Sequence, residues 1–394
     1  MTIDYSPARL LLIIAYIGFI SLGLPDTIIG VAWPSVRDTF SLQQSAMALI
    51  LFGGGGGYFL SSFFTGRLLN SIGIGMLLAA SSALVASSAF GYALAPMWGL
   101  FAACSLLQGL GSGAIDAGLN HYAAHHFSAR HMNWLHACYS VGATLGPLIM
   151  TSVLARNGSW RAGYLTVAVI LLCLALLFAA TRREWDEPDG AATEQAERAS
   201  VGMAETLRHP TVWRQVALFF VYTGLEATVG QWSFTLLTES RNVQKATAGA
   251  WVTTYWASIG VGRILFGSVV DRLGIDRLIR LSTLTSVLGT VLLALNLSGP
   301  TSAVALALAG LGLAAIYPCL MTSTPRRLGS ALAVHAIGFQ VSAAMLGAAA
   351  LPSVSGVLAE RFGLETVATA TVGMAFVVLL LHESLLLPSR RMRA

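Results

Sequence analysis

The chain has 394 residues, of which 55% are hydrophobic and 10% are charged, and its formal net charge is +5. Soluble domains carry about 25% charged residues, and a mean hydropathy of +0.71 leaves too little polar surface for a protein surrounded by water. These values exclude a soluble globular domain and predict an all-α integral membrane protein. Nucleic-acid binders gather their basic residues on one face. Here the arginines stand in short stretches between apolar runs, so no nucleic-acid partner is expected.

Twelve apolar runs are long enough to cross a bilayer, which takes about 20 residues per helix. Six runs precede a polar segment that is interpreted as a cytoplasmic linker, and six follow it. This order predicts a six-helix bundle over residues 1–181, a linker over 182–210 and a second bundle over 211–394. The predicted spans are 10–36, 44–69, 74–94, 97–125, 133–155, 162–181, 213–238, 246–270, 278–297, 301–323, 331–356 and 365–387.

The lysine and arginine residues fall mainly on one side of these predicted spans. Cytoplasmic loops of membrane proteins carry an excess of both residues. With both termini inside, the inner side holds 17 of the 23 such residues. The reverse orientation would invert this bias, so both termini are predicted to face the cytoplasm. The six on the outer side are Arg37, Arg156, Arg161, Arg241, Lys245 and Arg361.

The two predicted bundles repeat each other at a constant offset. In a chain with 40 glycines one matching pair means little, but an offset of 201 that holds from the first helix to the fifth indicates a parallel repeat. Six plus six helices in parallel repeat resemble the major facilitator superfamily, which implies two pseudo-symmetric bundles. The glycines that recur 201 positions later are Gly23, Gly66, Gly73, Gly109, Gly111 and Gly146.

The loop between the eighth and ninth predicted spans carries a charged motif. It reads Gly267-x-x-x-Asp271-Arg272-x-Gly274, which resembles the cytoplasmic signature of the same superfamily. The resemblance implies that these four residues form a conformational latch, because their charges can pair with neighbouring helix ends and hold the inner side in one state. The first-half copy has Asn70-Ser71 in place of the charged pair, so a weaker latch is expected there.

Further motifs narrow the resemblance to one branch of the superfamily. The first helix carries Gly23-Leu-Pro-Asp26, the fourth carries Gly109-x-Gly111-x-Gly113-x-x-Asp116-x-Gly118-x-Asn120, and the seventh carries Tyr222-x-Gly224-x-Glu226-x-x-x-Gly230-x-Trp232. Together they resemble the fucose permease-like branch, which includes proton-coupled sugar symporters. The resemblance extends over nearly the whole chain and implies a small polar cargo.

Three carboxylates lie deep inside predicted spans: Asp26, Asp116 and Glu226. Ionisable residues in such positions are costly and usually functional. Because a low dielectric disfavours the charged form, we expect these groups to exchange protons near neutral pH and to couple transport to a proton gradient. Asp26 and Glu226 are one position apart under the offset, which predicts that they face one central cavity. A structural role stays open for each, and for Asp26 in particular, because Pro25 precedes it and a carboxyl can cap a broken helix.

Glu226 is the first choice for the proton carrier, because no proline adjoins it. Asp26 is then expected chiefly to hold hydroxyl groups of the cargo. Arg263 lies well inside a predicted span, and it is expected to snorkel or to support the signature loop rather than to bind cargo.

Amides and aromatic faces near the carboxylates suit a sugar ring. Tryptophan and tyrosine also serve as anchors at the membrane interface, so both roles stay open for the aromatic residues. The residues predicted to bind cargo are Asp26, Asn120, Gln231, Trp232, Tyr255, Trp256 and Gln340.

The predicted function is secondary active transport: proton-coupled uptake of a small sugar or related polar metabolite by alternating access. The expected protein is a monomer in a bacterial inner membrane, with a small-molecule substrate, protons and the lipid bilayer as partners. A proton antiporter that exports cationic or amphipathic compounds stays open, because unpaired carboxylates bind cations directly. No enzymatic activity, catalytic residue, cofactor or metal site is expected, since the sequence offers no nucleophile or metal-ligand constellation. The glycine runs lie inside apolar helices rather than after a strand, so they do not predict a phosphate-binding loop.

The charge bias generates a test of topology. A reporter that is active only in the cytoplasm, fused to the C-terminus, is expected to give full signal. A reporter that requires the periplasm, fused at the same position, serves as the control. Signal from the periplasmic reporter alone would overturn the predicted orientation.

Overall fold

The computed structural model describes residues 7–127, 129–185 and 203–386, which fold into helices and short connections without a strand. They form two compact units. The first comprises Met1–Asp189 and Ser233–Ala257, and the second comprises Gly190–Trp232 and Ser258–Ala394, each over its described residues. The first unit therefore includes a segment, Ser233–Ala257, that the sequence repeat assigns to the second half.

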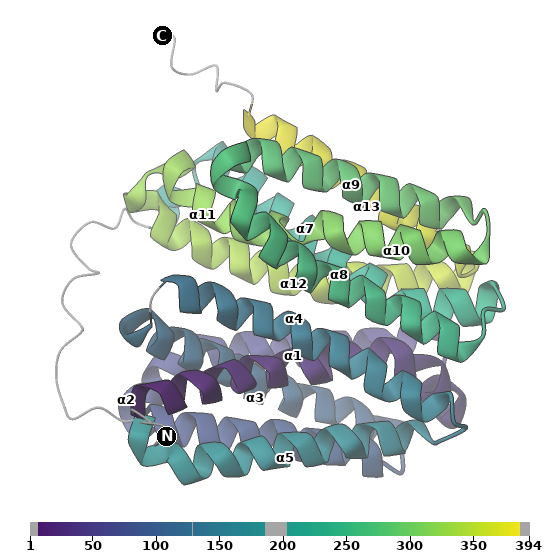
Figure 1. The fold of residues 1–394 in the computed structure, drawn as a ribbon, viewed down its shortest axis with the longest axis horizontal. Helices are drawn as coiled ribbons and strands as arrows, with labels where there is room; N and C mark the ends of the chain where they lie inside the picture. The colour runs from purple at the N-terminus through teal and green to yellow at the C-terminus, as the bar shows by residue number, and fades with distance from the viewer. Residues whose placement is uncertain (1–6, 128, 186–202, 387–394) are drawn as a thin grey trace, which may run out of the picture. The chain divides into compact units, whose positions relative to one another are not determined.

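Five long helices make up most of the first unit (Figure 1). They are α1 (Pro7–Phe40), α2 (Met47–Leu94), α3 (Trp98–His126), α4 (Ala129–Leu154) and α5 (Trp160–Trp185). Within the unit α2 packs against α3 and α5, while α1 packs against α4. The side-by-side arrangement of α1 and α4 matters most for function, because it brings polar side chains of both helices together.

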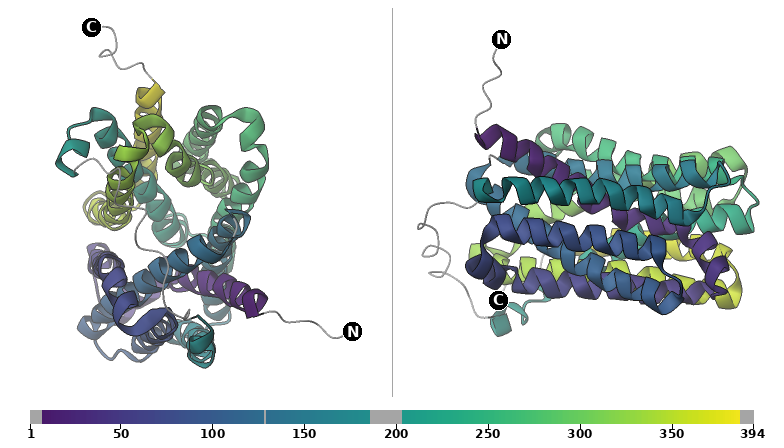
Figure 2. Two further views of the ribbon diagram at one scale, coloured as in Figure 1. Left: turned by 90° about the vertical axis from the view of Figure 1, so that its left-hand side faces the viewer. Right: turned by 90° about the horizontal axis from the view of Figure 1, so that it is seen from below.

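Most of the remaining helical residues belong to the second unit, which Figure 2 shows from two further directions. The end of α7, the turn that follows it and the first part of α8 fall within Ser233–Ala257 of the first unit. α9 packs against α10 and α13, and α11 packs against α12. A π-helical turn, Leu236–Ser240, extends the end of α7. The helices are α6 (Met203–Thr206), α7 (Pro210–Thr235), α8 (Lys245–Leu273), α9 (Ile275–Leu295), α10 (Gly299–Leu313), α11 (Ile316–Leu328), α12 (Ser330–Phe362) and α13 (Glu365–Leu386).

The helix lengths account for the twelve predicted spans. Among the described residues, nine stretches are apolar and long enough to cross a membrane, and one of them, Gln44–Leu94, is long enough for two crossings. α7 and α8 have 26 and 29 residues, which at 1.5 Å per residue is about 40 Å, more than the hydrocarbon core of about 30 Å. Their lower hydropathy reflects polar residues such as Glu226, Gln231 and Arg263. The predicted all-α membrane fold with twelve spans is confirmed.

Two glycines divide helices at equivalent places in the repeat. Gly73 interrupts α2 with φ 74°, and Gly274 separates α8 from α9 with φ 79°. L-residues with a side chain rarely adopt such angles, whereas glycine does so readily. The two glycines are 201 positions apart. In each unit, therefore, a glycine with a positive φ angle turns the chain between two consecutive spans.

The helix contacts repeat with the same offset. A Cβ atom added at Gly111 would lie 2.7 Å from the carbonyl oxygen of Ser81, and one added at Gly312 would lie 2.7 Å from the carbonyl oxygen of Ser282. Both glycines and both serines are 201 positions apart. The recurrence of one packing contact, residue for residue, is structural evidence for the two pseudo-symmetric halves.

The tight packing of glycines in the second unit generates a test. A Cβ at Gly347 would meet the backbone of Phe220, including its carbonyl carbon at 2.7 Å. Because a backbone cannot rotate away, Gly347→Ala is expected to destabilise the protein by about 1–3 kcal/mol, measured by thermal unfolding in detergent. Gly373 has open space around it, so Gly373→Ala is the control and should cost nothing. Equal melting temperatures for the two variants would contradict the packing argument.

Candidate functional site

Asp26 lies in the middle of α1 and receives hydrogen bonds from two neighbouring helices. Gln108 Nε2 of α3 donates to its Oδ1 at 3.0 Å, and Tyr139 Oη of α4 donates to its Oδ2 at 3.2 Å. α1 approaches α4 closely because Gly23 has no side chain, and a Cβ there would lie 2.6 Å from the amide nitrogen of Ala143. Both donors are neutral, so the carboxyl is held in place without requiring a fixed charge on its partners.

Asp116 forms a second polar cluster in the same unit. Tyr58 Oη of α2 donates to its Oδ2 at 2.6 Å, and Asn120 Nδ2, one helical turn away, donates to its Oδ1 at 3.0 Å. His136 of α4 lies within electrostatic reach of the carboxyl. Asn120, predicted to bind cargo, is thus bonded to Asp116 in this structure and shapes the cluster.

Glu226 lies in the second unit and faces a cation. Arg263 Nη2 of α8 is 4.0 Å from Glu226 Oε1, and the two side chains are 18% and 13% exposed. Tyr222, one turn earlier on α7, donates to the other carboxylate oxygen. From the sequence, Arg263 is expected to support the signature loop or to snorkel. The structure instead places it opposite Glu226.

The other residues predicted to bind cargo are mostly enclosed by protein. Trp232 is fully buried and donates to the carbonyl oxygen of Pro352 at 2.9 Å. Tyr255 is also fully buried, and its ring meets that of Trp256 edge to face at a centroid distance of 5.1 Å. Trp256 is 6% exposed, and its indole Nε1 has no acceptor among the described residues. Of these three aromatic residues, Trp256 therefore keeps a polar group for a ligand.

Gln340 belongs to a buried amide network in the second unit. Its Oε1 accepts from Thr324 at 3.1 Å and its Nε2 donates to Gln215 Oε1 at 3.0 Å. Gln340 is fully buried. Its two hydrogen bonds link α12 to α11 and to α7. Gln231 is also buried, at 7% exposure.

The signature loop lies at the end of α8, where Gly267 and Gly274 have open space around them. Asp271 and Arg272 are exposed, and among the described residues neither takes part in an ion pair. The ion pairs nearby in the sequence join Arg327 to Asp276 and Arg280 to Glu383, each at 2.6 Å. The predicted latch role of the loop stays a prediction.

A polar network that the sequence does not predict joins the segment Ser233–Ala257 to the helices that begin the first unit. We call it the Glu239 network, formed by Trp33, Arg37, Gln44 and Glu239. Glu239 Oε2 accepts from Arg37 Nη1 at 3.0 Å and from Gln44 Nε2 at 3.1 Å, and Trp33 Nε1 donates to Gln44 Oε1 at 3.0 Å. Trp33 is fully buried. The network thus ties the π-helical turn after α7 to the end of α1.

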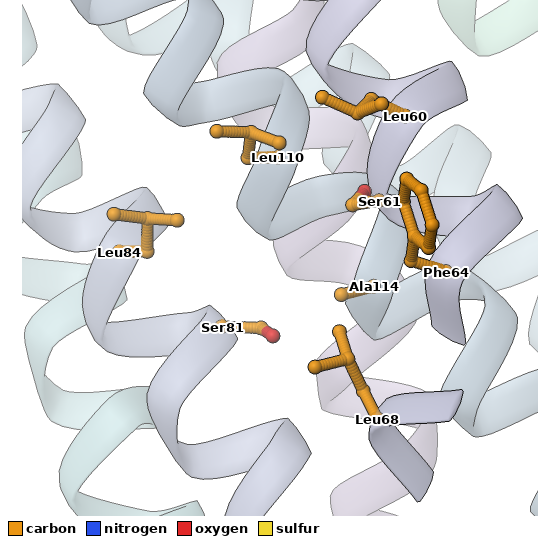
Figure 3. Close-up of a pocket in the computed structure, with 8 residues that line it drawn as sticks. All are labelled: Leu60, Ser61, Phe64, Leu68, Ser81, Leu84, Leu110 and Ala114. Atoms are coloured by element: carbon orange, nitrogen blue, oxygen red, sulfur yellow. The ribbon is translucent and has the colours of Figure 1, made fainter. Parts of the chain in front are cut away.

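Figure 3 shows a cavity of about 330 Å³ in the first unit, between the two parts of α2 and α3. Leu60, Phe64 and Leu68 are each more than one-third exposed, so the cavity opens onto the apolar surface. An apolar lining offers few partners to a polar cargo, which argues against this cavity as the transport site. The lining residues are Leu60, Ser61, Phe64, Leu68, Ser81, Leu84, Leu110 and Ala114.

Sequence reasoning missed Tyr58, Gln108 and Tyr139 as partners of the two aspartates. Each is a polar residue inside an apolar span, which is the same signal that identified the carboxylates. Their pairing depends on which helices adjoin, and the repeat alone does not predict that.

The all-α fold has carboxylates inside its spans that accept hydrogen bonds from neighbouring helices. A family model described as Major Facilitator Superfamily matches residues 15–243 and 216–393, so the chain belongs to this superfamily and is a multi-pass membrane protein. The predicted family is confirmed.

Individual relatives are distant but span most of the chain. It is 24% identical to Bypass of stop codon protein 6 of Saccharomyces cerevisiae, over 91% of this chain and 78% of that protein. It is 24% identical to the glucose/mannose transporter GlcP of Bacillus subtilis, over 78% of each. A crystal structure of the nucleoside transporter NupG superposes with a TM-score of 0.76 at 13% identity, over 96% of this chain and 100% of that one.

The Glu239 network generates a double-mutant test. Arg37→Gln, Glu239→Gln and the combined variant are expected to show a coupling energy of about 1 kcal/mol, because the two side chains are only 20% and 25% exposed. Thermal unfolding of the unmodified protein and of these three variants supplies the four free energies of the cycle. Asp38 also pairs with Arg37 but is 70% exposed, so Asp38→Asn is the control and should have a smaller effect. Strictly additive effects of the first two changes would show that the pair contributes nothing.

Proposed function

We propose that this protein is a proton-coupled importer of a small sugar or related polar metabolite. It acts as a monomer in a bacterial inner membrane, with both termini in the cytoplasm, and works by alternating access of a site that faces each side in turn. The observation that carries the proposal is the Asp26 carboxyl, held inside a span by an amide and a phenol. Such a group can take up and release a proton during each transport cycle.

The neutral donors around Asp26 matter for proton coupling. Gln108 and Tyr139 can remain hydrogen-bonded to the carboxyl whether or not it carries a proton, because a protonated carboxyl keeps an acceptor oxygen. Protonation of Glu226 would instead remove a negative charge that faces the Arg263 guanidinium, which is costly inside a span. We therefore rank Asp26 first as the proton carrier and keep Asp116 and Glu226 as further candidates. The first-ranked proton carrier is therefore Asp26, where the sequence favoured Glu226.

A polyhydroxylated cargo suits the polar groups of the first unit. Asp26 offers carboxylate oxygens, Gln108 an amide and Tyr139 a phenol, all of which exchange hydrogen bonds with hydroxyl groups. Trp256 supplies an aromatic face and a free indole N–H. The Bacillus subtilis relative that is named a glucose/mannose transporter supports a hexose as the first cargo to test. A proton antiporter for cationic compounds remains an outcome of that test.

The Glu239 network and the signature loop are suited to form their pairings in alternate states of the transport cycle. The Glu239 network lies at the end of the first unit that the charge bias assigns to the outside. The signature loop, with Gly267, Asp271, Arg272 and Gly274, lies at the end assigned to the inside. We propose that the network holds the outer side closed while Asp271 and Arg272 are unpaired, and that the loop pairs when the network opens.

Proton coupling predicts separate effects on accumulation and exchange. Asp26→Asn in proteoliposomes is expected to abolish accumulation of labelled glucose above its outside concentration under an inward proton gradient. Counterflow, which needs no proton movement, should continue at a measurable rate.

Asp116→Asn is the comparison variant, because it removes the other carboxyl of the first unit. Gradient-driven accumulation by Asp26→Asn, with an unchanged pH dependence, would show that Asp26 is not the coupling group. Export of cationic compounds by the unmodified protein, without sugar uptake, would favour the antiporter.

A further inference from the structure

The cavity between the two parts of α2 opens onto the surface that faces the bilayer. Leu60, Phe64 and Leu68, on the first part, are each more than one-third exposed. Ser81, on the second part, points its hydroxyl into the cavity, and α3 supplies two further lining residues (Figure 3). Because the three exposed side chains are apolar, the cavity is accessible from the hydrocarbon of the membrane.

The volume and the lining of the cavity suit a hydrocarbon chain. An apolar protein cavity of about 150 Å³ accepts benzene, and this one, at about 330 Å³, is roughly twice as large. Only Ser61 and Ser81 among its lining residues have polar side chains, so water would find few hydrogen-bond partners there. Contacts between apolar atoms are individually weak but add up. The acyl chains of the surrounding lipid are therefore the best occupants.

The cavity lies mainly in one leaflet of the bilayer. Gly73 turns the chain between the two parts of α2, and Leu68 and Leu60 precede it by five and thirteen positions. At about 1.5 Å per residue they lie roughly 8 and 20 Å along the helix from the turn, in a bilayer whose hydrocarbon core is about 30 Å thick. A lipid of the leaflet at the Gly73 end can therefore reach the cavity with its chain while its headgroup lies near the turn.

Arg67 is the charged residue beside the cavity. Its guanidinium lies over the ring of the lining residue Phe64, with the central carbon 5.6 Å from the ring centroid. Residues 39–115 contain no other arginine and no lysine, aspartate or glutamate, and among the described residues no carboxylate pairs with Arg67. Under the offset of 201 it corresponds to Ser268, so the repeat does not require a cation here. An exposed arginine without an acidic neighbour in its own spans suits a phosphate at the membrane surface.

We propose that this cavity is a binding site for an anionic phospholipid, with an acyl chain between the two parts of α2 and the headgroup phosphate on Arg67. The apolar lining accounts for the chain of such a ligand, and the arginine accounts for its charge. An inorganic anion would leave the lining without a contact, and an uncharged hydrocarbon would leave Arg67 without one. The proposal rests on neither the proposed cargo nor the proposed proton coupling.

Phosphatidylglycerol with a photoreactive diazirine on one acyl chain tests the site. The purified protein is illuminated in nanodiscs of phosphatidylcholine that contain a small fraction of this probe, and mass spectrometry identifies the labelled segments. Labelling is expected at the lining segments 60–68, 81–84 and 110–114. Unlabelled phosphatidylglycerol should displace the probe from them, whereas the same amount of zwitterionic phosphatidylethanolamine should not.

Four variants separate the charge contact from the chain contact. Arg67→Gln should lower the labelling about fivefold, because one arginine contributes about that factor at an anionic lipid surface, and Arg67→Lys should restore most of it. Ser81→Leu should also lower the labelling, because its added carbon atoms occupy the cavity. Ser87 is exposed on the same part of α2 and does not line the cavity, so Ser87→Leu is the matched control and should be labelled like the unmodified protein.

The proposal is overturned if the lining segments are not labelled, or if phosphatidylethanolamine displaces the probe as well as phosphatidylglycerol does. It is overturned as well if Arg67→Gln or Ser81→Leu is labelled like the unmodified protein. Thermal unfolding of each variant establishes that it is folded. Because Arg67 is exposed, its variants keep the proposal testable even if Ser81→Leu is unstable. Lipid labelling needs no cargo and no gradient, so these results are independent of the transport assays.

Discussion

A polar or charged side chain inside a bilayer must find its partner within the protein, because the hydrocarbon core offers neither water nor counter-ions. The three carboxylates of this chain meet that requirement in different ways. Asp26 and Asp116 accept hydrogen bonds from tyrosine and from amide side chains, whereas Glu226 faces Arg263 and receives a bond from Tyr222. Neutral donors contact the two carboxyls of the first unit, whereas a cation faces the carboxyl of the second.

Glycines place these partners within reach of one another. Gly113 of α3 lies against α2, where a Cβ would lie 2.9 Å from Ser62 Oγ, and this close approach lets Tyr58 reach Asp116. Gly23 has the same effect between α1 and α4 for Tyr139 and Asp26. Small residues at helix interfaces allow backbones to approach closely in membranes, where packing replaces the hydrophobic drive between helices. The polar chemistry of the first unit therefore depends on residues that have no polar group.

The two units keep the same packing but differ in chemistry. Gly111 and Gly312 make equivalent contacts, and Gly73 and Gly274 turn the chain in the same way. At the polar positions the correspondence ends: Tyr139, which binds Asp26, is matched by Gln340, which belongs to a buried amide network. The two units thus share a scaffold and differ in the polar groups that it holds.

The sequence alone determined the twelve spans, the repeat and the identity of the three carboxylates. Span length is a local property, and an ionisable residue in an apolar run is anomalous without knowledge of its neighbours. The tertiary structure alone decided the partners. Arg263 is 37 positions from Glu226 on another helix, and Trp232, Tyr255 and Gln340 are enclosed by protein. A helix that is apolar on all sides gives no periodic signal of which face turns inward, so only the packed structure shows what each polar side chain meets.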